Sequence, residues 1–190
     1  MNEPALQLVE TARRGDEQAA ARLIELFYQR LYAFLRRLAG NDADAADLTQ
    51  RAFARIWPAL PGFAGRSSVA SWMHSIAYRT YVDWLRSNHR PEDRSDEWWA
   101  QRAAGGRTPD EAAVAADLAA SLYAAVDHLE PDVRATVHLH YYQGLTLDET
   151  ADALGVATST VKYRLRQAIA VLQAEFKEEP ALQPSSPRCL

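Results

Sequence analysis

The sequence predicts an all-α protein in which a flexible charged linker joins two small helical domains. Three observations support this fold class. Apolar residues recur at three- and four-residue spacing in several long stretches, as they do on one face of a helix. Apolar and polar residues do not alternate over any length that would indicate a strand. Residues 91–111 break the helical pattern with prolines, glycines and dense charge.

The composition is that of a protein with real hydrophobic cores. Apolar residues make up 48% of the 190 residues, and the single cysteine, Cys189, cannot form an internal disulfide. The sequence shows no apolar run of membrane-spanning length and no pattern of a signal peptide at its N-terminus. We therefore expect a cytoplasmic protein.

Three long helices are predicted in the first domain, residues 1–90. The first covers about 19–38 and ends at Gly40, a residue typical of a helix C-terminus. The second covers about 44–57, where Pro58 should end it. The third covers about 69–87.

The predicted linker, residues 91–111, separates these helices from a second helical domain at 112–178. In that domain one helix should begin at Pro131 and end at Gly144. Trp98-Trp99 is unusual in a linker, and the pair either covers a domain edge or contacts a partner. A proline-rich tail, 179–190, is expected to be disordered.

The distribution of charge indicates contact with nucleic acid at two places. The net charge is −4, but residues 63–90 and 155–177 are both basic, and the acids collect between them. Basic patches attract phosphates, whereas the overall acidity predicts modest affinity for DNA. Such a protein would need a partner to bind tightly.

The sequence from Thr146 onward predicts a helix-turn-helix unit. Thr146 and Glu149 have the spacing of a capping box, and Gly155 provides the turn before the next helix. In that next helix an apolar face should pack inward, formed by Val161, Leu165, Ala168, Ile169 and Leu172. The opposite face would read base edges, and cations on its flanks would meet phosphates. A solvated outer face is the alternative. The residues concerned are Ser159, Tyr163, Arg166 and Gln167, with Lys162 and Arg164 on the flanks.

The helix predicted at 69–87 has a second cationic face. Trp72, Arg79 and Arg86 lie on it, and aromatic side chains beside arginines suit the unstacked bases of single-stranded DNA. Trp72 could instead cover the edge of the core. Asp83 lies four residues from Arg79 and three from Arg86, so it could brace both.

These stretches together resemble the extracytoplasmic-function (ECF) group of bacterial sigma factors, in the sigma-70 family. The resemblance covers about residues 15–176 and depends on the order and spacing of five short stretches. They are Asp44 to Gln50 with Phe53 and Trp57; Phe63 to Ser68; Trp72 to Ala77 with Asp83 and Arg86; Gly144 to Ala151; and Thr160 to Leu165.

The resemblance implies a non-enzymatic factor that binds core RNA polymerase and promoter DNA and is held by an anti-sigma factor or other regulator. It implies that residues 1–90 are sigma region 2 and residues 112–178 are sigma region 4. Three sets of site residues follow from it. They are Asp44, Asp47, Gln50 and Arg51 for the polymerase clamp; Phe63, Arg66, Ser67, Trp72, Arg79 and Arg86 for the minus-ten element; and Ser159, Lys162, Tyr163, Arg164, Arg166 and Gln167 for the minus-thirty-five element.

The sequence departs from the family pattern at four positions. Ala46 and Arg51 stand where the family usually has acids, which predicts weaker docking on a basic clamp surface. Arg79 replaces a usual Asn. Ala157 replaces a usual capping Ser, so that Thr158 would cap instead. Phosphorylation of Thr49 would be one way to restore negative charge to the docking helix.

Three other classes of protein are the alternatives. One is an interaction-only adaptor without DNA binding, against which the cations Lys162, Arg164 and Arg166 argue. A polymerase-independent helix-turn-helix repressor or activator would bind duplex DNA alone, usually as a dimer. An enzyme has no support, because no phosphate loop, paired cysteines or nucleophile motif is present. His138 and His140 point to different helix faces and predict no metal site. His74 and His128 are expected at the surface or at a domain edge, and no cofactor is predicted.

Overall fold

The computed structural model describes residues 3–88 and 121–178, and every regular element in these two ranges is helical. The predicted linker 91–111, Trp98-Trp99 within it, and the tail 179–190 lie outside the described residues. The helices run in the order α1 (Glu3–Ala12), α2 (Glu17–Ala39), α3 (Asp42–Ala59), the 3₁₀ turn η1 (Leu60–Gly62), α4 (Val69–Asn88), α7 (Pro131–Val137), the π-helix η2 (His138–Tyr142), α8 (Leu147–Leu154) and α9 (Thr158–Glu178). A further helical segment covers residues 121–128.

Local caps determine where α2 begins and ends. The Asp16 carboxylate accepts hydrogen bonds from the backbone of Gln18 at 2.8 Å and Ala19 at 3.0 Å, and α2 therefore starts at Glu17. Gly40 ends it with a φ of 84°, a left-handed conformation that glycine adopts without steric cost. The predicted position of this helix is confirmed to within two residues at each end.

Pro58 does not end α3, contrary to the sequence prediction. The helix continues to Ala59, and η1 follows directly. Proline lacks one backbone donor, and in the last turn that loss affects a single hydrogen bond. The short helix α1 was not predicted, because its buried residues, Ala5, Val9 and Ala12, give a weak apolar signal.

The first hydrophobic core forms where α2 packs on α1, α3 and α4. Its largest fully buried side chains include Phe27, Leu31, Phe34 and Leu35 of α2, Leu48 and Ile56 of α3, and Met73 of α4. The four residues of α2 belong to the apolar stripe that helical periodicity predicts for residues 19–38.

The C-terminal helices have a core of their own. Val126, Val133 and Val137 pack there against Val161 and Leu165 of α9. The sequence predicted a regular helix from Pro131 to the glycine at 144. The structure instead changes to a π-helix at residues 138–142, after which Gln143 donates its backbone N–H to the His138 carbonyl at 2.9 Å.

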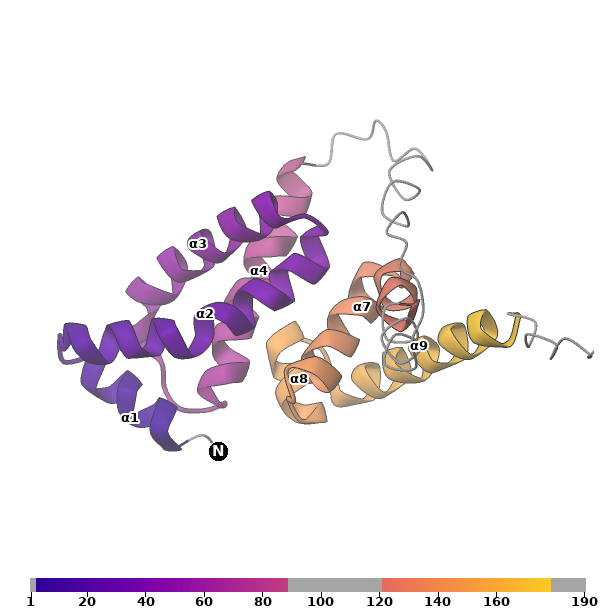
Figure 1. Ribbon diagram of the computed structural model, residues 1–190. Helices are drawn as coiled ribbons and strands as arrows, with labels where there is room; N and C mark the ends of the chain where they lie inside the picture. Colours follow the sequence, from indigo (N-terminus) through magenta and orange to yellow (C-terminus); the bar gives the residue numbers. More distant parts are fainter. Residues whose placement is uncertain (1–2, 89–120, 179–190) are drawn as a thin grey trace, which may run out of the picture.

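The two groups of helices pack directly against each other, with α4 against α8 (Figure 1). Leu139, Leu145 and Leu154 from the C-terminal half are buried in the same cluster as the core of the N-terminal half. Within the described ranges, no helix is both long enough and apolar enough to cross a membrane.

Candidate nucleic-acid interface

The outer face of α9 is exposed as the helical wheel predicted. Val161, Leu165 and Ala168 are buried, at 0%, 7% and 2% exposed. Ile169, which was predicted to pack inward with them, is 43% exposed. The exposed residues near the start of the helix are Ser159, Lys162, Tyr163, Arg166 and Gln167. Five of the six predicted base and phosphate contacts are therefore accessible.

The predicted capping box fixes the start of α8, the helix that precedes α9. The Thr146 hydroxyl accepts from the Glu149 backbone N–H at 3.2 Å, and the Glu149 carboxylate accepts from the Thr146 N–H at 3.0 Å. Gly155 ends α8 with a φ of 68°. The prediction that Thr158 caps α9 is wrong, because α9 begins at Thr158 and the carbonyl of Ala157 accepts the first helical bond, from the Val161 N–H at 3.2 Å. The Thr158 hydroxyl donates to Asp148 at 2.8 Å and ties α9 to α8.

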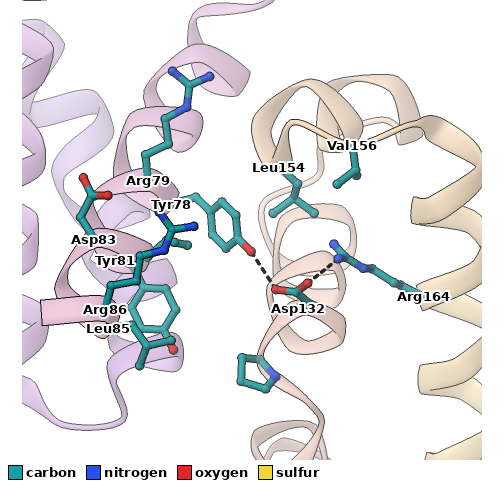
Figure 2. A pocket seen from close by; sticks show the side chains of 12 residues that line it. Tyr78, Arg79, Tyr81, Asp83, Leu85, Arg86, Asp132, Leu154, Val156 and Arg164 are labelled. Atoms are coloured by element: carbon teal, nitrogen blue, oxygen red, sulfur yellow. Dashed lines mark hydrogen bonds and ion pairs between the residues drawn. The ribbon is translucent and has the colours of Figure 1, made fainter. Parts of the chain in front are cut away.

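Arg164 is the sixth predicted contact, and it is largely covered. Its guanidinium forms an ion pair with Asp132 of α7, and 16% of its side chain is exposed. Asp132 also accepts a hydrogen bond from the Tyr78 hydroxyl of α4 at 2.9 Å (Figure 2). The carboxylate thus lies between the predicted minus-ten helix and the predicted minus-thirty-five helix.

The loop after η1 exposes fewer predicted residues than expected. Phe63 is 5% exposed and its ring packs against Trp72, with the two centroids 5.0 Å apart. Its prediction as a DNA contact does not fit this burial. Trp72 is half-buried against the core edge, which was the alternative interpretation of that residue. Arg66 is exposed and Ser67 is partly so.

The ion pairing of Asp83 differs from the prediction. Its carboxylate pairs with Arg55 of α3 at 2.7 Å and not with Arg79 or Arg86 of its own helix. Arg79 and Arg86 are both exposed and line a cleft of about 500 Å³ between α4 and the C-terminal helices (Figure 2). They are therefore accessible to a negatively charged ligand.

The predicted clamp-docking face lies on the outer side of α3. Gln50 and Arg51 are exposed, and Asp44 and Asp47 are partly exposed. Arg51 forms an ion pair with Asp47 at 2.7 Å, so it neutralises one of the two acids of this face. Thr49 is fully buried and donates to the Ala45 carbonyl at 2.7 Å, which argues against its modification in the folded protein.

His74 lies inside the molecule and not at the surface. It is fully buried beside Phe34, where its Nδ1 lies 2.8 Å from the Ala70 carbonyl and its Nε2 has no hydrogen-bond partner. Burial lowers the pKa of His74 to about 4, and the nearby Arg30 contributes to the shift. Burial likewise lowers the pKa of His138 to about 3.

We expect His74 to make stability depend on pH. The folded protein binds the proton less well than the unfolded chain, so stability is retained above pH 6.5 and is lost as the pH falls toward 4. Replacing His74 with Gln should remove about 2 kcal/mol of the stability difference between pH 7 and pH 5. Urea unfolding at the two pH values measures this, and an unchanged difference would contradict it.

Within the described residues, no group of three His, Cys, Asp or Glu side chains could hold a metal ion. His138 is buried and stacks on Tyr142, whereas the His140 Nδ1 lies 2.8 Å from the Leu145 carbonyl. The two histidines point to different partners.

The fold and its exposed faces define a helical protein with a helix-turn-helix unit and a second cationic helix. Two family models match it: Sigma-70 region 2 over residues 23–91, and Sigma-70, region 4 over residues 119–172. It is 32% identical over 165 residues to the ECF RNA polymerase sigma factor SigX of Bacillus subtilis, a match that covers 85% of each chain. The chain belongs to the ECF RNA polymerase sigma factors.

Other relatives agree with this assignment. The ECF RNA polymerase sigma factor SigE of Mycolicibacterium smegmatis is 32% identical, over 88% of this chain and 67% of its own. Two solved structures share the fold. CnrH in complex with the cytosolic domain of CnrY has a TM-score of 0.69 at 21% identity, covering 93% of this chain and 99% of that one. The sigma factor RpoE in complex with the anti-sigma factor NepR from Bartonella quintana has a TM-score of 0.63 at 20% identity. That match covers 84% of this chain and 98% of the RpoE chain.

Proposed function

We propose that this protein directs core RNA polymerase to promoters by binding two DNA elements with two separate helices. The observation that carries the proposal is the exposed polar and cationic face of α9, presented by a capped helix-turn-helix in a chain of the ECF family. The protein performs no chemistry on its ligands in this role. Because its partner is the polymerase, it acts in the cytoplasm.

The helix α9 reads the minus-thirty-five element in this proposal. Tyr163, Arg166 and Gln167 project from the side opposite its buried face, where side chains of a major-groove helix meet base edges. Lys162 lies on the flank and contacts phosphate. These contacts position the C-terminal half on duplex DNA.

The helix α4 and the loop before it bind the minus-ten element. Arg79 and Arg86 supply exposed cations on one side of α4, and Arg66 supplies another from the loop. Trp72 offers the edge of a ring that Phe63 supports from behind. A partly exposed aromatic ring beside cations suits a strand whose bases are unstacked.

The outer face of α3 docks on the polymerase clamp through Asp44, Asp47 and Gln50. The protein also binds an anti-sigma factor or a comparable regulator. In the solved RpoE complex the partner of that sigma factor is the anti-sigma factor NepR, and we extend this type of partner to the present chain.

Run-off transcription with purified core polymerase, on the promoter upstream of the protein's own gene, tests the function. We expect a specific transcript only when the protein is added. We also expect weak promoter binding by the protein alone, because its net charge is −4 and its cations are divided between two sites. Tight, sequence-specific duplex binding without polymerase, at physiological salt, would indicate the repressor or activator instead.

Arg166→Ala should reduce discrimination at one base pair of the upstream element by roughly 1–3 kcal/mol. Lys162→Ala is the comparison within the same helix, and it should weaken binding to all upstream sequences equally and reduce the salt dependence. Transcription from a set of single-base promoter variants measures both effects. Equal weakening on every promoter by Arg166→Ala would show that this side chain does not read a base.

A further inference from the structure

A short loop, residues 64–67, lies between η1 and α4 and carries Arg66 and Ser67, two of the residues predicted to contact the minus-ten element. Arg66 is exposed and Ser67 is partly exposed, and Gly65 turns the backbone with a φ of 68°. Among the described residues, the side chains of Arg66 and Ser67 have no hydrogen-bond partner. The position of the loop therefore depends on how its two ends are held.

The end of the loop that leads into α4 is held by that helix itself. The Ser68 hydroxyl accepts a hydrogen bond from the Ser71 backbone N–H at 3.1 Å, and the Ser68 carbonyl accepts from the Trp72 N–H at 3.0 Å. These are the bonds of a serine at the N-cap of a helix. This anchor depends only on the first turn of α4.

The other end of the loop is held by a residue from a distant part of the chain. The guanidinium of Arg13 donates to the Pro61 carbonyl at 2.7 Å and to the Phe63 carbonyl at 3.2 Å. Phe63 is the last residue before the loop, and its own N–H donates to the Leu60 carbonyl at 3.1 Å. The planar guanidinium presents several donors in a fixed arrangement, which the ammonium group of lysine does not. One side chain therefore fixes two carbonyl groups where the chain leaves η1.

The helix α1 fixes the position of Arg13. Ala5, Val9 and Ala12 of this helix are buried in the N-terminal core, and the Arg13 backbone N–H donates to the Val9 carbonyl at 2.9 Å. In the ribbon, α1 lies at the same end of the N-terminal half as the chain that leads into α4 (Figure 1). The helix thus carries a cation to the C-terminal end of the α3–η1 segment, where a positive charge is favourable.

The same anchor also affects the aromatic edge proposed for unstacked bases. The Phe63 ring is buried against Trp72, with the two centroids 5.0 Å apart. A shift of the Phe63 backbone would move the ring that supports Trp72. The contacts of Arg13 therefore determine both where the loop begins and how the tryptophan is supported.

We propose that Arg13 is a positioning residue for minus-ten recognition, which holds residues 64–67 in the conformation that presents Arg66 and Ser67 to DNA. It acts through the backbone of Pro61 and Phe63 and touches no base itself. Groups that recognise a ligand must be held within about 0.5 Å of the productive geometry, and a loop that is already ordered loses less conformational freedom on binding. This inference rests on the proposed function, since it concerns the minus-ten element.

Run-off transcription with core polymerase, on promoters that carry single-base changes in the minus-ten element, tests the proposal. Arg13→Gln removes both bonds to the loop and one positive charge. It should lower transcription from the preferred element roughly 10-fold and reduce the preference at the bases that the loop contacts. Affinity for core polymerase should not change, because Arg13 lies away from the predicted clamp-docking face on α3.

Arg14→Gln is the matched control. Arg14 is the next residue along the chain, it is exposed, and its side chain has no hydrogen-bond partner among the described residues. The control loses the same charge and should transcribe every promoter variant as the unsubstituted chain does. Equal effects of Arg13→Gln and Arg14→Gln would overturn the proposal.

Arg13→Lys separates positioning from a direct contact with phosphate. Lysine keeps the charge but does not reproduce the paired bonds to the two carbonyl groups, so transcription and base preference should recover only in part. Full recovery by Arg13→Lys would overturn the proposal in favour of a phosphate contact. Equal weakening on every promoter variant by Arg13→Gln would overturn it as well.

Hydrogen exchange in the free protein gives a measurement that is independent of transcription. Arg13→Gln should speed exchange of the Phe63 amide roughly 10-fold and leave the Trp72 amide at its original rate. An unchanged Phe63 rate would overturn the proposal, and so would an equal increase at both amides, which indicates general destabilisation. If the unsubstituted protein gives no transcript, the proposed function fails, whereas the two exchange rates still show whether Arg13 holds the loop.

Discussion

Reversing both acids of the clamp-docking face, with Asp44→Lys and Asp47→Lys together, should lower the affinity for core polymerase on the order of 100-fold. The two carboxylates lie on the outer side of α3. In the proposed docking, lysines there would face the basic clamp surface that the family resemblance implies. The ion pair between Asp47 and Arg51 would also become a repulsion. The opposite change, Ala46→Glu with Arg51→Glu, restores acids and should raise the affinity.

Fluorescence anisotropy of labelled protein titrated with core polymerase measures both changes. Glu25→Lys with Asp152→Lys is the matched control, because it makes the same change of net charge at exposed positions on α2 and α8. Lysine in the first turn of α3 opposes the helix dipole, so the free energy of unfolding is measured in parallel. Equal affinity in the reversal and the control would show that this face does not dock on the polymerase.

Phe34→Ala should lower the free energy of unfolding by about 3–5 kcal/mol. The side chain is fully buried, and its ring meets His74 edge-on with the centroids 5.5 Å apart. Truncation removes buried apolar surface and leaves a cavity between α2 and α4. The free energy of unfolding of a domain is about 5–15 kcal/mol in total, so this loss would be a large fraction of it.

Urea unfolding at pH 7 measures this loss, and Phe34→Leu is the comparison. Leucine keeps most of the side-chain volume and should cost less than about 1.5 kcal/mol. If Phe34→Ala lowered the free energy of unfolding by less than about 1 kcal/mol, the neighbouring helices would have moved to fill the cavity. Such a small loss would also mean that packing against His74 contributes little to the first core.

His74 lies close to a hydrogen bond that joins the two halves of the molecule. Arg30, which joins the two halves through Gln143, is also among the causes that lower the pKa of His74. Protonation of His74 would place a second positive charge near that guanidinium in a site with little water. Acid conditions should therefore weaken two things in the same pH range: the N-terminal core, and the packing of the two halves against each other.

Local patterns in the sequence were sufficient to predict the helices and the buried face of α9. Thr146 and Glu149 are three residues apart, so a capping box depends on no distant part of the chain, and the structure has it. The burial of Val161, Leu165 and Ala168 follows in the same way from their shared side of one helix. Helical periodicity also shows that Asp83 lies near Arg79 and Arg86 on α4.

Tertiary packing decided which of these neighbours actually interact. Asp83 pairs with Arg55, 28 residues away, and Arg164 pairs with Asp132, 32 residues away. A long charged side chain can form an ion pair with a residue of any helix that packs beside it. Spacing within one helix does not show which other helix that will be. The burial of Phe63 and His74 has the same origin, because the core that covers them is assembled from distant segments. The sequence alone thus determined the family, the long helices and most of the buried face of α9. The short helix α1, the π-helix at residues 138–142 and the packing of the two halves against each other appear only in the tertiary structure.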